Sequence, residues 1–214
     1  AAADDASADL APPSPWTEQA WPEGGHWRAI AGLRFDEILV VGDAGRALLW
    51  NGLDFLPLDL SLGTGLGEDF AVDLYGADAR EDEGLETLAV VGAAGTLLRR
   101  QNGGPFEALD SGVNANLRDL RLLGPDSLYA VGDGGAILRW ENGDGSPEGA
   151  NTGSSLHAIW GEDAFDLSIT DASGGVYEKM GDTWFRQQIT SGAAGLWGLD
   201  GVQGLRVTVG DKGT

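Results

Sequence analysis

Short apolar runs separated by glycine-containing turns recur along the chain, and this pattern predicts β-strands rather than helices. The stretch LYAVGDGGAILRWENG, residues 128–143, reads as a strand, a tight turn, a second strand and a second turn. Related stretches follow at residues 39–52, 89–103, 168–181 and 207–214. No apolar stripe with a 3.6-residue period persists through them, so we expect an all-β chain of short strands.

The recurring stretch belongs to a repeat of about 40 residues. Its third turn position recurs after 50, 40, 38 and 40 residues and is occupied by Asp43, Ala93, Asp133, Asp171 and Asp211. A short segment that ends in an aliphatic residue precedes each turn, at residues 27–30, 71–74, 117–120, 156–159 and 196–199. Four short antiparallel strands in each unit are typical of a β-propeller blade.

The repeat predicts one propeller domain, residues 14–214, after an Ala-, Asp- and Pro-rich flexible arm at residues 1–13. Whole blades are expected at residues 27–60, 70–110, 116–150 and 155–190. Residues 195–214 supply only the first strands of a unit, and residues 14–22, where Trp16 matches Trp184, supply only a fourth. We therefore expect a five-bladed β-propeller of four-stranded antiparallel blades, with the ring closed by pairing of the N- and C-terminal strands.

Composition narrows the range of partners. The net charge is −21, from 34 acidic and 13 basic residues, and such a surface repels phosphate backbones and anionic membranes. We expect no nucleic-acid partner and no direct membrane insertion. Cysteine is absent, which excludes disulfides and thiolate metal sites. The acidity serves solubility and also leaves a basic partner or a bound cation open.

No motif predicts catalysis. The GDGG stretch at residues 132–135 precedes a strand, whereas a phosphate-binding loop precedes a helix, so we interpret it as a hairpin turn. His26 and His157 lack metal-ligand spacing, and no G–x–S–x–G or H–E–x–x–H motif occurs. We expect no cofactor, no metal and no enzymatic activity. Because carboxylates are numerous, a hydrolase with its site at the central channel stays as an alternative.

The units that contain L–x–x–I/L, then AVGDGGAILRW, then G–x–x–W resemble the secreted and lipoprotein-type β-propeller repeats of bacteria. They are more distantly similar to Ycf48-like photosystem assembly propellers and to BNR/Asp-box repeats. This sequence departs from those patterns at Ala93 and Ser146, has no complete S–x–D–x–G–x–x–W box, and is too acidic for the Arg-rich patch of the Ycf48 group. The resemblance implies a non-catalytic, extracytoplasmic propeller.

Two sets of residues are candidates for binding. The turn aspartates could form a ring on one face that meets basic side chains or a cation, namely Asp43, Asp133, Asp171 and Asp211. Three aromatic residues could line a partner or ligand surface, namely Tyr75, Trp160 and Trp197, with Tyr75 placed at the same repeat position as Trp160. We expect a protein-interaction platform, an accessory subunit of a cell-envelope complex, with a carbohydrate-binding propeller as the first alternative.

Overall fold

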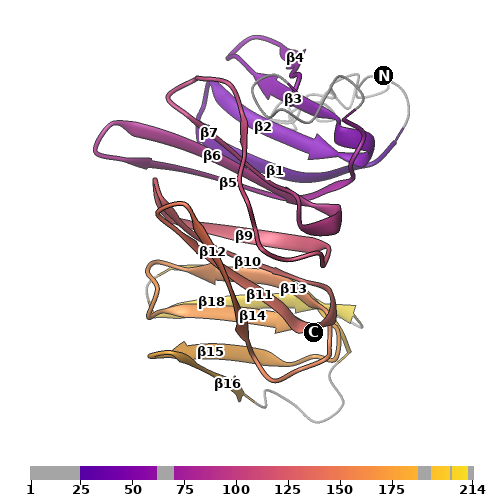
Figure 1. Cartoon of the computed structure of the whole chain (residues 1–214), viewed down its shortest axis with the longest axis vertical. Helices are drawn as coiled ribbons and strands as arrows, with labels where there is room; N and C mark the ends of the chain where they lie inside the picture. The colour runs from indigo at the N-terminus through magenta and orange to yellow at the C-terminus, as the bar shows by residue number, and fades with distance from the viewer. Residues whose placement is uncertain (1–24, 62–69, 188–193, 203, 212–214) are drawn as a thin grey trace, which may run out of the picture.

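The computed structural model describes residues 25–61, 70–187, 194–202 and 204–211, and its regular elements are β-strands and three short 3-10 turns (Figure 1). Four four-stranded antiparallel sheets follow one another along the chain, and a strand pair ends the described part. The all-β class and the four-stranded units predicted by the sequence are confirmed. The arm at residues 1–13 and the expected closing strand at residues 14–22 lie outside the described residues.

In each sheet the strands lie in chain order, and each is antiparallel to the next. The first sheet contains β1 (Trp27–Arg34), β2 (Glu37–Gly42), β3 (Ala47–Trp50) and β4 (Phe55–Pro57). The second contains β5 (Leu74–Asp82), β6 (Leu85–Gly92), β7 (Leu97–Gln101) and β8 (Glu107–Ala108). The third contains β9 (Leu117–Gly124), β10 (Ser127–Gly132), β11 (Ala136–Glu141) and β12 (Asp144–Gly149). The fourth contains β13 (Leu156–Gly161), β14 (Leu167–Asp171), β15 (Val176–Met180) and β16 (Thr183–Gln187). The final pair is β17 (Leu196–Val202) and β18 (Leu205–Gly210).

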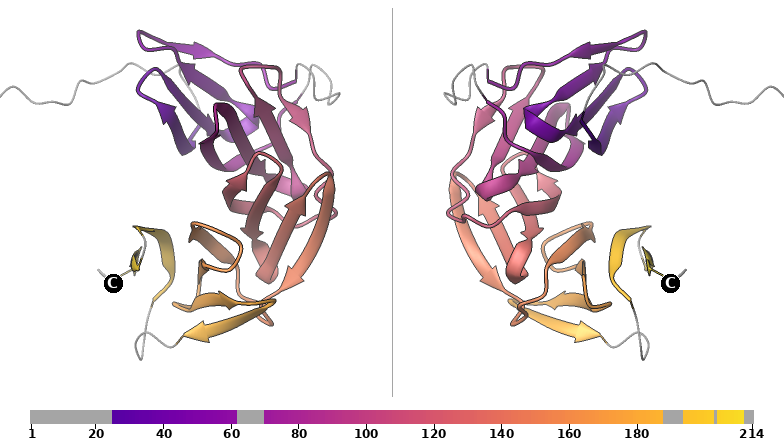
Figure 2. Two further views of the ribbon diagram at one scale, coloured as in Figure 1. Left: turned by 90° about the vertical axis from the view of Figure 1, so that its left-hand side faces the viewer. Right: turned by 90° about the vertical axis from the view of Figure 1, so that its right-hand side faces the viewer.

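The sheets stand side by side along an arc, and Figure 2 shows that the arc is open between the first sheet and the β17–β18 pair. Neighbouring units meet mainly through their first strands: β1 contacts β5, β5 contacts β9, β9 contacts β13, and β13 contacts β17. This is the relation between blades in a propeller, where the first strand of each blade lines the central channel.

The core lies between the sheets because alternate residues of a strand point to opposite faces. On β2, for example, Leu39 and Val41 pack towards Leu88 and Val90 of the second sheet. The same relation joins the second sheet to the third and the third to the fourth. Each fully buried aliphatic side chain contributes about 1.5–3 kcal/mol, so the contacts between units are a major source of stability.

The turn between the second and third strands also holds the units together. In the first three sheets it is one 3-10 turn, at Asp43–Gly45, Ala93–Gly95 and Asp133–Gly135. A Cβ atom added to Gly95 would lie 1.9 Å from the carbonyl oxygen of Val113, in the segment that leads into the next unit. Because Gly95 has a φ of 74°, glycine is required there on both counts. The third of these turns leads directly into β11, which confirms that GDGG is a hairpin turn.

Candidate functional site

The second residue of each first strand points to one end of the channel. The residue before it pairs with the last residue of the second strand in all five units, so these positions are equivalent. The five side chains line a hollow of about 280 Å³, and we call them the channel mouth: Arg28, Tyr75, Arg118, His157 and Trp197. Small and aliphatic residues of the same strands line the hollow below them, namely Ala29, Ile30, Ala77, Ala158 and Leu199.

Two turn aspartates hold the two arginines of the channel mouth. The Nε atom of Arg28 donates to Asp43 at 2.5 Å, and the Nε atom of Arg118 donates to Asp133 at 2.5 Å. The hydrogen bond from Arg28, helped by the backbone N–H of His26, lowers the pKa of Asp43. Burial alone raises the pKa of Asp133, but its bonds from Arg118 and Asn116 outweigh burial and lower that pKa. Both carboxylates are therefore ionised at neutral pH.

A third turn aspartate follows the same rule with a different donor. The indole Nε1 atom of Trp197 donates to Asp211 at 2.8 Å. In the second unit the turn residue is Ala93, whose side chain accepts no hydrogen bond. The channel-mouth residue of that unit is Tyr75. The aspartates thus bond side chains of their own units, and the described residues contain no group of three or more His, Asp or Glu side chains placed to hold a metal ion.

The assignment of Asp171 to this turn position is wrong. Asp171 pairs with Leu156, as Gly132 pairs with Leu117, so it is the last residue of its strand. The residue at the turn position is Ala172, whose N–H donates to the carbonyl of Ser155 as that of Asp133 does to Asn116. The side chain of Asp171 is buried and accepts hydrogen bonds from its own hairpin, including 2.9 Å from the hydroxyl of Tyr177.

Tyr75 lies between the two arginines of the channel mouth. The guanidinium carbon of Arg28 is 5.4 Å from the centre of the Tyr75 ring, and that of Arg118 is 5.6 Å from it. Attraction between a cation and the face of an aromatic ring contributes about 0.5–1 kcal/mol at such partly exposed sites. The row from Asp43 through Arg28, Tyr75 and Arg118 to Asp133 therefore crosses three units and is fixed at both ends.

The other side of the channel mouth is aromatic. The rings of His157 and Trp197 lie 4.2 Å apart. Burial, with the nearby positive charge of Arg118, lowers the pKa of His157, so its imidazole is neutral at pH 7. The side chain of Trp197 is 50% exposed, which makes it the large open apolar surface of the site.

Trp160 does not belong to this surface. It is only 6% exposed and packs between the guanidinium carbons of Arg121 and Arg206, at 6.0 and 5.5 Å from its ring centre. Tyr75 is not its equivalent, because Leu74 pairs with Gly92 as Leu156 pairs with Asp171. Tyr75 is equivalent to His157, which lies three residues before Trp160, the residue that the sequence had matched to it.

One carboxyl group below the channel mouth has an unusual environment. The oxygens of Asp119 accept from the N–H groups of Leu120 and Ile159, both at 2.9 Å, so the side chain joins the third sheet to the fourth. Burial raises the pKa of Asp119 to about 7, outweighing these two hydrogen bonds, and the negative charge of Asp78 raises it further. Asp119 therefore changes charge near neutral pH.

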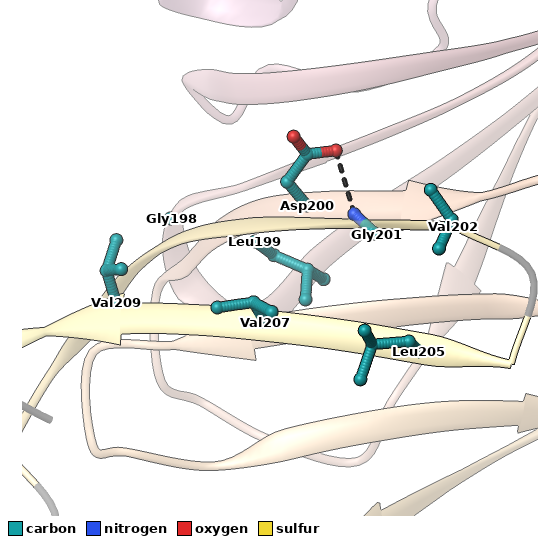
Figure 3. A pocket seen from close by; sticks show the side chains of 8 residues that line it. All are labelled: Gly198, Leu199, Asp200, Gly201, Val202, Leu205, Val207 and Val209. Carbon is teal, nitrogen blue, oxygen red and sulfur yellow. Dashed lines mark hydrogen bonds between the residues drawn. The ribbon is translucent and has the colours of Figure 1, made fainter.

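A second hollow, of about 600 Å³, lies on the β17–β18 pair and has a different character. Figure 3 shows its lining, in which Val202, Leu205, Val207 and Val209 cover one face and Asp200 bonds only the next N–H along the chain. These aliphatic side chains are exposed. The face lacks a convergent set of polar groups, which a specific ligand site requires, so we treat it as an uncovered packing surface.

Comparison with known proteins identifies the fold. No family model and no curated protein matches the sequence. Among solved structures, the chain is similar to a Ycf48 bound to a D1 peptide, with 13% identity, 82% of this chain and 58% of that chain covered, and a TM-score of 0.60. For Ycf48 from Cyanidioschyzon merolae these values are 14%, 89%, 65% and 0.57, and for an ancestral GH74 enzyme 12%, 85%, 29% and 0.58.

These likenesses show a β-propeller fold. The chain spans about three fifths of the length of the two Ycf48 structures. Within the described ranges, no helix is long and apolar enough to cross a membrane.

Of the channel-mouth residues, sequence reasoning named Tyr75 and Trp197 as candidates for a partner or ligand surface, and it missed Arg28, Arg118 and His157. One signal was available: an arginine stands fifteen positions before an aspartate in both the first and the third unit, as Arg28 with Asp43 and Arg118 with Asp133. That spacing indicates an ion pair across the first two strands once their register is known.

Proposed function

We propose that this protein is a non-catalytic β-propeller that binds a partner protein at the channel mouth. The carrying observation is that all five units contribute an equivalent side chain to one hollow, and that each of the five is an arginine or an aromatic residue. Arginine, tyrosine and tryptophan are the side chains that dominate the binding energy of protein interfaces. Their anchoring by Asp43, Asp133 and Asp211 lowers the entropy lost on binding.

The similarity to Ycf48 supports this proposal. One of the similar structures is a Ycf48 bound to a D1 peptide, which is an example of a propeller of this fold that holds a peptide. The GH74 likeness covers only 29% of the enzyme. At the channel mouth the two turn carboxylates are bonded to arginines, an arrangement that favours holding a ligand over transferring a proton to it.

The experiment is a binding assay with a matched exposed control. The immobilised protein captures its partner from a cell-envelope extract, and the purified partner is then titrated into the wild type, Trp197→Ala and Leu53→Ala. Leu53 is 80% exposed in the turn between β3 and β4, away from the channel mouth. We expect Trp197→Ala to weaken the affinity about 30-fold or more, as for a central interface residue, and Leu53→Ala to leave it unchanged. Equal affinities of the three proteins would contradict the proposal.

We also propose that the ring has five blades and that residues 14–22 complete the blade of β17 and β18. Trp16 stands eleven residues before Trp27, as Phe106 stands eleven before Leu117 in the second and third units. The exposed aliphatic face of β17–β18 supports the need for a further covering element. Truncation tests this: deleting residues 1–22 should lower the free energy of unfolding, whereas deleting only the arm, residues 1–13, should leave it unchanged. Equal stabilities of the two shortened chains would contradict the proposal.

We further propose an extracytoplasmic location, as an accessory subunit of a cell-envelope complex. The support is the resemblance of the repeats to secreted and lipoprotein-type bacterial propellers, together with the Ala-, Asp- and Pro-rich composition of residues 1–13, which suits a tether. Fractionation of the source cells tests it: recovery with the cytoplasmic markers would contradict the proposal.

A further inference from the structure

We infer that the channel mouth takes an extended, uncharged stretch of three or four residues whose one large apolar side chain enters the channel. This inference rests on the proposed function and names the chemistry of the partner segment. Three features of the site carry it: the pairing of its charges, the spacing of its arginines, and the apolar lining below them.

The charges of the rim are already paired. Each arginine of the channel mouth gives its Nε–H to a turn aspartate that its own bond keeps ionised. A ligand carboxylate approaching Arg28 would also approach Asp43, and one approaching Arg118 would also approach Asp133. A ligand cation would meet the guanidinium groups. Neutral acceptors, such as backbone carbonyls, can take the remaining guanidinium N–H groups without either repulsion.

The spacing of the arginines sets the length of the segment. The two guanidinium carbons lie 5.4 and 5.6 Å from the centre of the Tyr75 ring. At most about 11 Å therefore separates them, so an extended segment of three or four residues, at 3.3–3.4 Å per residue, is long enough to reach both. The guanidinium groups are partly exposed, with side-chain exposures of 38% and 35%, so they remain open to such a segment.

The lining below the rim selects the side chain. It contains the apolar side chains of Ala29, Ile30, Ala77, Ala158 and Leu199 together with one carboxyl group, that of Asp119. His157 is neutral at pH 7, and Trp197 is half exposed beside it. A hollow of about 280 Å³ with this lining accommodates one large apolar side chain, which would contact the Trp197 ring as it enters.

The experiment uses blocked peptides, so that neither end carries a charge. The probe is an N-acetylated, C-amidated pentapeptide of glycine and threonine with phenylalanine at its centre, and three versions carry alanine, aspartate or lysine there. Each is titrated calorimetrically into the full chain. The protein variants are Trp197→Ala, Arg118→Lys, which keeps the charge but removes spare N–H donors, and the exposed control Leu53→Ala.

We expect the phenylalanine peptide to bind, the other three to bind at least tenfold more weakly, and both site variants to weaken the phenylalanine peptide at least fivefold. The inference is overturned if the aspartate or lysine peptide binds as tightly as the phenylalanine peptide. It is also overturned if no peptide binds while partner binding still depends on Trp197, and in that case the proposed function stands. If a peptide binds equally to all variants, or if partner binding ignores Trp197, the proposed site itself is wrong.

Discussion

The third sheet and the β17–β18 pair have the same strand register but opposite surroundings. The last but one residue of the second strand faces the next unit in the complete sheets. The residues at this position are Val41, Val91, Val131, Thr170 and Val209. The first four are fully buried, whereas Val209 is 59% exposed. Val131 and Val209 are the same residue at the same position, so the difference comes from their surroundings. Among the described residues, β18 has neither a third strand beside it nor a next unit to pack against.

The interfaces between complete units also carry buried cations that the outward face of β17–β18 lacks. The ammonium of Lys179 lies 5.2 Å from the Tyr129 ring centre and 5.3 Å from that of Trp184, and it donates to Glu148 at 2.8 Å. Tyr129 occupies in the third sheet the position that Val207 occupies in β18. The comparison indicates that this fold is stabilised from one unit to the next, so substitutions at junctions should matter far more than the same substitutions at the open end.

The largest expected effect concerns the turn that receives the next unit. Gly135 has a φ of 79°, and an added Cβ would lie 2.0 Å from the carbonyl oxygen of Thr152, so we expect Gly135→Ala to lower the free energy of unfolding by about 4 kcal/mol or more. Its neighbour Gly134 has open space around its Cβ position, and alanine stands there in the first two units, as Ala44 and Ala94. In urea denaturation Gly134→Ala should therefore cost only about 1 kcal/mol, for placing alanine at a φ of 67°. Equal losses of stability in the two variants would show that the turn does not pack against the segment around Thr152.

The second effect is a pH dependence of the free energy of unfolding. It comes from Asp119, which lies at the junction of the third and fourth sheets, at the position that Gly198 occupies in β17. The pKa of Asp119 is about 7 in the folded protein and 3.8 without its surroundings. Between these values the folded state binds more protons than the unfolded state, so the unfolding free energy falls as the pH rises from 4 to 7. At 1.36 kcal/mol per pH unit the fall is on the order of 4 kcal/mol at most.

The difference between the wild type and Asp119→Asn isolates this effect from the other carboxyl groups. The variant should lack that part of the slope and should carry only a constant offset from its altered hydrogen bonds. Asp78→Asn tests the coupling: because the Asp78 carboxylate contributes to the raised pKa of Asp119, this variant should lower that pKa and reduce the slope. A wild-type slope retained in Asp119→Asn would assign the titration to other groups.

The third effect is the matched pair Val131→Ala and Val209→Ala. Removing two buried methyl groups at Val131 should cost about 2–3 kcal/mol. At the exposed Val209 the same change should stay within about 0.5 kcal/mol. Chemical denaturation of both variants provides the measurement, and a comparable cost at Val209 would mean that its face is covered in solution.

The smallest expected effect is a gain in stability from a substitution at Thr170. Thr170 occupies the position of Val41, Val91 and Val131, and its buried hydroxyl has no hydrogen-bond partner among the residues that the structure describes. Replacing a buried, unsatisfied hydroxyl by a methyl group of the same shape should stabilise the protein, and we expect about 1 kcal/mol from Thr170→Val. The reverse change, Val131→Thr, should destabilise by a similar or larger amount. A loss of stability in Thr170→Val would indicate a polar partner for this hydroxyl.

The repeat pattern was enough to predict the sheets, because turn residues and strand alternation are local properties of the sequence. Asp43, Asp133 and Asp211 were correctly placed at equivalent turns. Asp171 was misplaced because the fourth turn, DASGG, lets an aspartate align one residue too early, and only the pairing of Leu156 with Asp171 fixes the register.

The channel mouth could not be assembled from the sequence for a related reason. Tyr75 was displaced because the hairpin of β5 and β6 is longer than the others: eighteen residues separate Leu74 from its partner Gly92, and fifteen separate Leu117 from Gly132. The grouping of Arg28, Tyr75 and Arg118 depends on contacts between units, which no single repeat encodes.

The most direct test of the central claim, that the channel mouth is the binding site, is a comparison of two tryptophan indole N–H signals by NMR. Trp197 is half exposed at the channel mouth, whereas Trp160 is buried between Arg121 and Arg206. Single Trp→Phe variants assign the two signals. On titration with the blocked phenylalanine peptide, and with the purified partner, the Trp197 signal should move and the Trp160 signal should stay. Movement of Trp160 with Trp197 unchanged, or bound ligand with both unchanged, would contradict the account.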